Sequence, residues 1–150
     1  MIEVQVRTAN AEQAPDIASL VSEVYGAFTG DFVPTALKWT PDQVAAEHGH
    51  WLVATRDAQL VGAVHHHPDP EGYTLDALSV RTERRREGIG SRLVSEVERR
   101  ARCSGATQMI IALRRTLPAN TVFFTSHGYR VTRPYGDEHD VYVKPLEASR

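Results

Sequence analysis

The order of strand-like and helix-like apolar patterns limits the folds that this chain can adopt. Residues 2–6 alternate between apolar and polar, which is the period-two pattern of a strand with one buried face. Apolar residues between positions 17 and 28 then recur at helical spacing. The apolar, β-branched runs WLVAT (51–55) and LVGAVHHH (60–67) are separated only by RDAQ, and they therefore predict a hairpin.

The rest of the chain continues this mixture of patterns. Residues 73–80 predict a further strand, and a second amphipathic helix is expected to begin around Gly88. A short apolar strand is expected at 108–113 and a helix at 118–128, before two closing strands around the turn RPYGDE. The expected order is β, α, loop, β, β, β, α, β, α, β, β. This order favours an α+β fold without internal repeats.

Two local signals mark the starts of helices in the first third of the chain. Asn10 and Gln13 have the spacing of a capping box before the first amphipathic helix. The segment GDFVPTALKWTPDQ contains one glycine and two prolines, and it is expected to form a loop with a short helix after Thr40.

Length and composition narrow the class of protein. At 150 residues and a net charge of −2, the chain is expected to form one domain, residues 1–150, without a nucleic-acid partner. Cys103 is the only cysteine, which excludes an internal disulfide and a Cys-based zinc site. The N-terminus lacks the pattern of a signal peptide, and no apolar stretch approaches the roughly 20 residues of a membrane span. We therefore expect a cytoplasmic protein with no membrane partner.

The segment VRTERRREGIGSRL, residues 80–93, joins an expected strand to an expected helix. Backbone N–H groups at a helix start lack intrahelical partners, and Gly88 and Gly90 have no Cβ to keep a bulky anion away. The helix dipole and Arg85 also favour negative charge, so the segment predicts a pyrophosphate site. The alternative is a solvated basic turn in which the glycines only let the chain bend.

Two other phosphate-binding motifs do not fit this segment. GIGSRL lacks the third glycine of the dinucleotide fingerprint, and the element order contains no repeated βαβ unit. The sequence has no GxxxxGK[ST] motif, which excludes a P-loop nucleotidase at the level of motifs.

Arg85, Gly88 and Gly90 match the Q/R-x-x-G-x-G/A loop of the GNAT acyltransferase superfamily, directly after the strand LDALSV. The element order also agrees over nearly the whole chain, which therefore resembles this superfamily. The resemblance implies a mixed, mostly antiparallel sheet of about six or seven strands with about four helices on both faces. It also implies splayed strands four and five, and N-acetyl transfer from acetyl-CoA to an amine.

The resemblance assigns the coenzyme A contacts residue by residue. The residues expected to bind the pyrophosphate are Arg85, Arg86, Glu87, Gly88, Ile89, Gly90 and Ser91. The backbone amides near Leu78 and Val80 are expected to pair with the pantetheine, and that of Leu78 to polarise the thioester carbonyl. The thioester is expected between LDALSV and QMIIAL.

The last helix, PANTVFFTSHGY, departs from the family in one position. Phe124 stands where the family has a tyrosine that protonates the departing thiolate, whereas Asn120, Phe123 and Phe124 are expected to contact coenzyme A. A thiol titrates near about 8.5, so a thiolate leaves without much help from an acid. Losing a general acid costs about a hundredfold to ten-thousandfold, which slows an enzyme without abolishing catalysis. Tyr135 and Ser126 are the alternative donors.

A base must remove the proton of the attacking amine. The candidates are Asp76 and the histidines of 60–67, where His65 and His67 face one side of the strand and His66 the other. Asp76 and His66 are the catalytic candidates. The alternative to catalysis is that the three histidines lie at an exposed strand end and that Asp76 has only a structural role. An HxH pair can also bind metal, but no partner stands at ligand spacing, so we expect no metal site.

The acceptor is the least constrained part of the prediction. By resemblance, Tyr25 and Phe28 shape its pocket, although their helical spacing fits core packing equally well. We expect a small-molecule amine, and exposed strands at the C-terminal edge favour a homodimer. Two other classes stay open, namely a coenzyme A binding module that has lost catalysis and an interaction protein or nucleic-acid binder that uses the arginine-rich loop.

Overall fold

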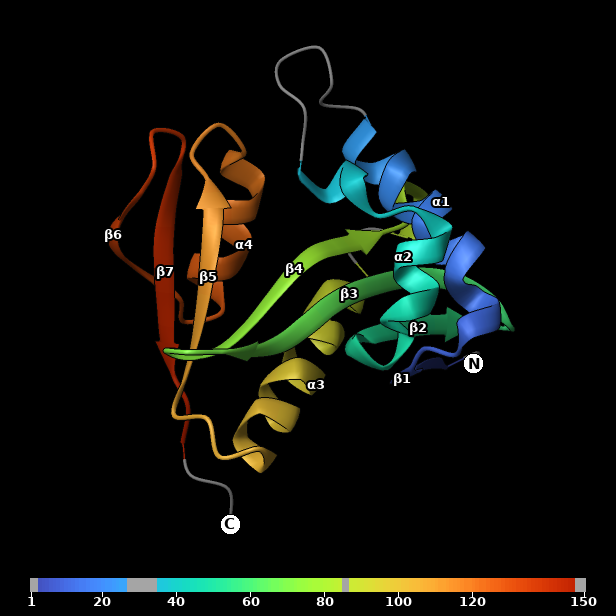
Figure 1. Ribbon diagram of the computed structural model, residues 1–150, viewed down its shortest axis with the longest axis horizontal. Coiled ribbons are helices and arrows are strands. Elements are labelled where there is room, and N and C mark those ends of the chain that lie inside the picture. The colour runs from blue at the N-terminus through green and yellow to red at the C-terminus, as the bar shows by residue number, and fades with distance from the viewer. Residues whose placement is uncertain (1–2, 27–34, 85–86, 148–150) are drawn as a thin grey trace. The chain divides into compact units, whose positions relative to one another are not determined.

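The structure, a computed structural model, describes residues 3–26, 35–84 and 87–147. The chain divides into two compact units, which are described separately (Figure 1). The first comprises Met1–His66 and Asp76–Val97, and the second comprises His67–Leu75 and Glu98–Arg150. In the described residues the hydrogen-bonded strands follow the order β1 (Val4–Thr8), β2 (Trp51–Arg56), β3 (Gln59–Asp69), β4 (Gly72–Val80), β5 (Gln108–Arg114), β7 (His139–Pro145) and β6 (Arg130–Tyr135).

The first unit is built on four strands. They are β1 (Val4–Thr8), β2 (Trp51–Arg56), most of β3 (Gln59–Asp69) and the end of β4 (Gly72–Val80). β1 pairs with β2 and β2 with β3, both antiparallel. The β2–β3 turn is made by Asp57 and Ala58, whose φ angles of 55° and 63° are those of a two-residue hairpin turn of the type I′ class. The predicted hairpin is confirmed.

Two helices cover one face of these strands, α1 (Ala14–Gly26) and α2 (Pro41–Ala46) (Figure 1). Both expected starts are confirmed. The Asn10–Gln13 capping box closes on the short 3-10 helix that leads into α1, and Thr40 forms a second box with Gln43 at α2. The apolar core beneath these helices includes Ile17, Leu20, Val21, Val44, Trp51, Val53, Leu60, Ala63 and Ala77.

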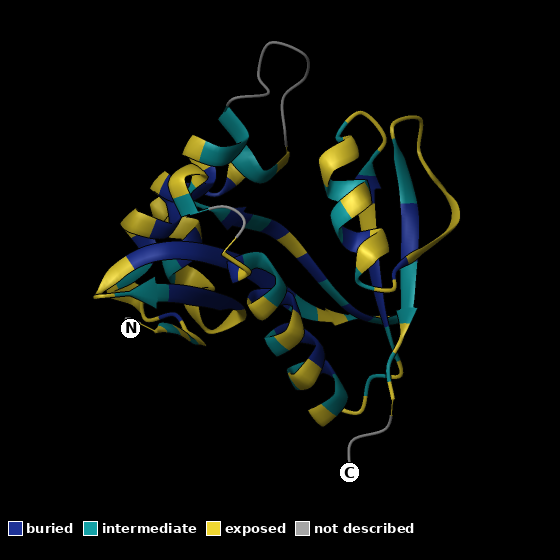
Figure 2. Ribbon diagram, turned by 180° about the vertical axis from the view of Figure 1, so that it is seen from behind, coloured by how far each residue is buried: buried dark blue, intermediate teal, exposed yellow. Residues whose placement is uncertain are grey.

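The opposite face is covered by α3 (Ile89–Cys103), which begins where the sequence predicted it (Figures 1 and 2). A Cβ on Gly62 of β3 would stand 2.9 Å from Ile89 Cγ2 and 3.0 Å from Leu93 Cδ1. The absence of a side chain at Gly62 therefore lets this helix approach the sheet closely.

The second unit contains β5 (Gln108–Arg114), α4 (Pro118–Ser126), β6 (Arg130–Tyr135) and β7 (His139–Pro145). β7 pairs antiparallel with both β5 and β6, whereas β5 pairs with β4 in parallel, with Tyr73 opposite Met109. Every residue of β6 is exposed (Figure 2).

One buried polar network lies inside the second unit. The Tyr129 hydroxyl donates to Glu98 Oε2 at 2.8 Å, and Lys144 Nζ lies 3.0 Å from Glu98 Oε1. Burial raises the pKa of Tyr129 well above its usual range, and the negative charge of Glu98 is the second cause. The hydroxyl therefore stays protonated and serves as a donor that satisfies the buried carboxylate.

The predicted fold class and element order are confirmed, with one difference at the last turn. β6 continues through Tyr135, so the turn before β7 is shorter than RPYGDE. None of the helices in the described ranges combines the length and the apolar character needed to span a bilayer.

Candidate active site

The middle of β4 contains a backbone irregularity that the sequence does not predict. Ala77 has a φ of +54°, a left-handed conformation that L-residues other than glycine rarely adopt within a strand. Its carbonyl oxygen accepts a hydrogen bond from Ser79 Oγ at 3.0 Å, and the carbonyl oxygen of Leu78 accepts one from Tyr25 Oη at 2.8 Å. Side-chain hydroxyls therefore hold the peptide groups on both sides of Leu78.

The junction between β4 and α3 matches the geometry expected of an anion site. Gly88 has a φ of +78°, and a Cβ built on it would meet nothing within 4 Å, so the backbone is open there. α3 begins at the next residue, which leaves the amides of its first turn without intrahelical carbonyls. Arg85 and Arg86, also expected at this site, lie outside the described residues.

The charge of Glu87 is compensated by one arginine of β2 and one of the same loop. Its carboxylate lies 2.9 Å from Arg56 Nη1 and 3.8 Å from Arg84 Nη1. An anion that approached the start of α3 would thus meet a carboxylate that is already paired with arginines.

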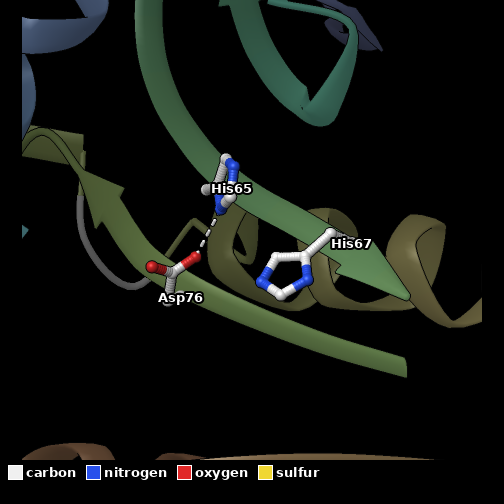
Figure 3. Close-up of side chains that lie close together, drawn as sticks. All are labelled: His65, His67 and Asp76. Carbon is white, nitrogen blue, oxygen red and sulfur yellow. Dashed lines mark hydrogen bonds and ion pairs between the residues drawn. The ribbon is translucent and has the colours of Figure 1, made fainter. Parts of the chain in front are cut away.

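His65 joins two carboxylates beside this strand. Its Nδ1 lies 2.7 Å from Asp76 Oδ1 (Figure 3), and its Nε2 lies 3.1 Å from Glu47 Oε1. The imidazole is 4% exposed and packs against Trp39 and Trp51, with ring centroids 4.4 and 5.3 Å away. The Asp76 and Glu47 side chains are about half exposed. A buried imidazole thus connects two carboxylates that solvent can reach.

The number of protons in this cluster follows from the hydrogen-bonding capacity of its members. A neutral imidazole carries one N–H, and an ionised carboxylate only accepts. The contacts of His65 to Asp76 and to Glu47 are therefore both hydrogen bonds only when the cluster holds one additional proton. Such a cluster can take up and release a proton at positions fixed by its own geometry.

The histidines of β3 differ from an exposed strand end. His65 and His66 are both buried at 4% exposure, so the interpretation of an exposed run is wrong for these two. The alternation of a strand places His65 and His66 on opposite faces, and of these two it is His65 that contacts Asp76. His67 is partly exposed, and its Nδ1 lies 2.8 Å from the carbonyl oxygen of Pro68.

Of the two residues expected in the acceptor pocket, Tyr25 and Phe28, the structure describes only Tyr25. Tyr25 lies in the last turn of α1 and directs its hydroxyl to the Leu78 carbonyl, while part of its ring packs on the core. Phe28 lies outside the described residues. The contribution of Tyr25 to an acceptor pocket stays a prediction.

The candidates of the second unit lie on α4 and β6. Asn120 and Phe123 are partly exposed, whereas Phe124 is 3% exposed and packs against Phe123 and Tyr129. Little of the Phe124 surface is therefore open to a ligand. Tyr135 is 63% exposed, with its ring 6.5 Å from that of His139.

Three residues of this site carried no signal in the sequence, namely Glu47, which the fold brings near β4, and Ala77 and Ser79 of β4 itself. Glu47 follows α2, far from Asp76 in the sequence, and no local pattern links them. The irregularity at Ala77 has no glycine to mark it, and Ser79 reads as an ordinary strand residue. For the histidines, the alternation of β3 was the one signal available in the sequence, because it places His65 and His66 on opposite faces of the strand.

Comparisons with known proteins agree with this architecture. The family model described as Acetyltransferase (GNAT) domain matches residues 47–131, more than half of the chain. The chain is similar to PaiA N-acetyltransferase from Thermoplasma acidophilum in complex with coenzyme A, with a TM-score of 0.86 and 16% identity, covering 96% of this chain and 99% of that one. No curated protein sequence matches the chain.

Two further solved structures show the same likeness. A GNAT-family acetyltransferase from Staphylococcus aureus Mu50 gives a TM-score of 0.80 at 14% identity, over 97% of this chain and 100% of that one. The ribosomal-protein-S18-alanine N-acetyltransferase from Escherichia coli gives 0.76 at 13% identity, over 99% and 97%. These likenesses support the fold, and the family model supports the expected family and enzyme class. The chain belongs to the GNAT acetyltransferase family and is an acetyl-CoA-dependent acyltransferase.

Proposed function

We propose that this enzyme transfers the acetyl group of acetyl-CoA to the amine of a small molecule, by direct attack in a ternary complex. The observation that carries the proposal is the stretch from β4 to α3, where a held peptide segment at Leu78 precedes the open turn at Gly88. The segment at Leu78 thus offers a place for a carbonyl oxygen, and the turn at Gly88 offers a place for an anion.

The turn and the start of α3 are suited to the pyrophosphate of coenzyme A. The amides of Gly88, Ile89 and Gly90 lie where a helix N-terminus favours negative charge, and the open space at Gly88 admits a bulky group. Arg85, Arg86, Glu87 and Ser91 stay predicted members of this site, as does Val80 for the pantetheine.

The Leu78 amide is the donor that we assign to the thioester. Negative charge develops on the carbonyl oxygen as the amine attacks, and a fixed N–H stabilises it there. Such a donor contributes about a hundredfold to a thousandfold in rate. Its fixed surroundings at Leu78 support this role, because a donor that is already oriented needs no reorganisation during the reaction.

We assign removal of the ammonium proton to Asp76. Asp76 precedes Leu78 by two positions on β4, and His65 links it to Glu47. A proton taken up at Asp76 can therefore pass through the imidazole to Glu47 and leave to water. This arrangement favours His65 over His66 as the histidine of the site.

The remaining steps of the reaction do not require a further catalytic side chain. The amine nitrogen bonds to the carbonyl carbon, the C–S bond breaks, and coenzyme A leaves as a thiolate that is stable enough to depart unprotonated. Tyr135 stays the predicted alternative donor. Phe124 supports a second candidate, an acyl-CoA-binding module with impaired catalysis, because it replaces the usual acid.

The test incubates the protein with acetyl-CoA and defined acceptors, and detects acetylated products by mass spectrometry. The acceptors are a linear polyamine, an arylalkylamine, free amino acids and an alanine-terminated peptide, the last because one structural neighbour is named for a protein alanine. We expect acetylation of a small amine, lowered about a hundredfold in kcat/KM by Asp76→Asn. The control Asp16→Asn, on the exposed first turn of α1, should leave kcat/KM unchanged.

Two outcomes would overturn the proposal. Acetylation of the peptide alone would replace the small-molecule acceptor with a protein. Binding of acetyl-CoA without any product would favour the impaired module. Cytoplasmic location, a single domain and a homodimer stay predictions.

A further inference from the structure

Two hydroxyl groups hold the region of β4 around Leu78. Tyr25 Oη, from the last turn of α1, donates to the Leu78 carbonyl oxygen at 2.8 Å. Ser79 Oγ donates to the Ala77 carbonyl oxygen at 3.0 Å, and Ser79 is 1% exposed. All these residues belong to the first unit.

These two hydrogen bonds act on the two peptide groups that flank Leu78. A trans peptide group is planar, and its C=O and N–H point in opposite directions. The bond from Ser79 to the Ala77 carbonyl therefore fixes the plane that carries the Leu78 N–H. The bond from Tyr25 to the Leu78 carbonyl fixes the plane on the other side of the Leu78 Cα. Together they restrict both backbone dihedral angles of Leu78.

The backbone needs this support because its conformation is strained. Ala77 has a φ of +54°, which costs an alanine about 1–2 kcal/mol relative to a right-handed conformation. A strained segment keeps its shape only when its surroundings hold it there. A hydroxyl from another element, α1, is such a constraint.

We propose that Tyr25 and Ser79 are positioning residues that orient the Leu78 amide toward the thioester carbonyl of acetyl-CoA. This inference rests on the proposed function, since it assumes that the Leu78 N–H polarises that carbonyl. It gives Tyr25 a role distinct from lining an acceptor pocket, because its hydroxyl bonds to the backbone of β4. Loss of either hydroxyl should weaken polarisation of the thioester while the pyrophosphate site stays intact.

The test measures the carbonyl stretch of bound acetyl-CoA by difference infrared spectroscopy with ¹³C in the acetyl carbonyl. In the wild type the stretch should move to lower frequency on binding, as expected for a carbonyl that accepts a hydrogen bond. Tyr25→Phe and Ser79→Ala should each lose most of this shift. The affinity for coenzyme A, measured by calorimetry, should change by no more than about twofold, because coenzyme A lacks the thioester carbonyl.

A matched control removes a hydroxyl elsewhere. Tyr142→Phe, on β7, alters the same atom type on a strand of the second unit and should keep the full shift. With an acceptor from the panel, Tyr25→Phe should lower kcat about tenfold to a hundredfold and leave the KM for acetyl-CoA nearly unchanged.

The outcomes separate this inference from the proposed function. Failure of the wild type to bind acetyl-CoA would overturn both. A wild-type shift that both variants retain would overturn the positioning role alone and leave the proposed function intact. A raised KM for the amine with an unchanged kcat and carbonyl shift in Tyr25→Phe would assign Tyr25 to the acceptor pocket instead.

Discussion

His65 is buried, yet the two carboxylates that contact it are about half exposed. A buried imidazole between Asp76 and Glu47 can pass a proton from one exposed group to the other through its two nitrogens. A residue that only filled the core would need no such partners, because aliphatic side chains fill space without hydrogen bonds.

The first prediction concerns this imidazole. His65→Gln should lower kcat/KM for the amine about a hundredfold and change the shape of its pH profile, because glutamine cannot transfer a proton between two nitrogens. His48→Gln is the control, since that exposed side chain lies outside the cluster, with its Nδ1 3.2 Å from the carbonyl oxygen of Ala9. Identical pH profiles for His65→Gln and the wild type would contradict the relay.

The second prediction concerns Tyr129. Tyr129→Phe should lower the free energy of unfolding by about 1–3 kcal/mol, because it removes a donor from the buried carboxylate of Glu98. The measurement is urea unfolding at about pH 8. Arg133→Met, which breaks the exposed ion pair with Glu71, should cost no more than about 1 kcal/mol.

The raised pKa of Tyr129 adds a dependence on pH with a definite sign. Its stabilising contribution is complete below about pH 10, the ordinary range of a phenol, and is lost as the pH rises above it. The difference in unfolding free energy between wild type and Tyr129→Phe should therefore shrink from about pH 8 to about pH 10.5. A constant difference would contradict this, because it would show that Tyr129 titrates alike in the folded and the unfolded protein.

At the scale of elements, the patterns that local physics controls were predictable. Apolar spacing placed the strands and helices, and Asn10 with Gln13 and Thr40 with Gln43 close capping boxes at the starts of helices. The left-handed Ala77 was not predictable, because alanine gives no sign of a positive φ. The carbonyls of Ala77 and Leu78 accept hydrogen bonds from Ser79 and Tyr25, and the bond from Tyr25, on α1, forms only in the folded chain.

The third prediction tests how α3 meets β3. Gly62→Ala should lower the free energy of unfolding by about 1–3 kcal/mol, because the new Cβ would press on Ile89, Leu93 and the carbonyl of Ser79. Gly49→Ala, where a Cβ meets nothing within 4 Å, should change stability by no more than about 0.5 kcal/mol. Equal effects of the two substitutions in urea unfolding would argue against close packing at Gly62.

At the scale of the whole molecule, element order and one motif sufficed to predict the family. The order of strands and helices and the loop with Gly88 and Gly90 agree with the fold and with the GNAT family model. The candidate site was only partly predictable, because Glu47, His65 and Asp76 meet through tertiary contacts between α2, β3 and β4. Sequence spacing carries no information about such contacts.

The central claim is that the turn before α3 binds the pyrophosphate of acetyl-CoA, and calorimetric titration tests it most directly. Wild-type protein should bind both acetyl-CoA and coenzyme A, and Gly88→Glu should abolish binding by bulk and by repulsion. Gly136→Glu is the matched control, because this glycine also has a positive φ and open space but lies in the β6–β7 turn. Its titration should match the wild type. Binding that survives Gly88→Glu, or wild-type protein that binds neither compound, would contradict the account.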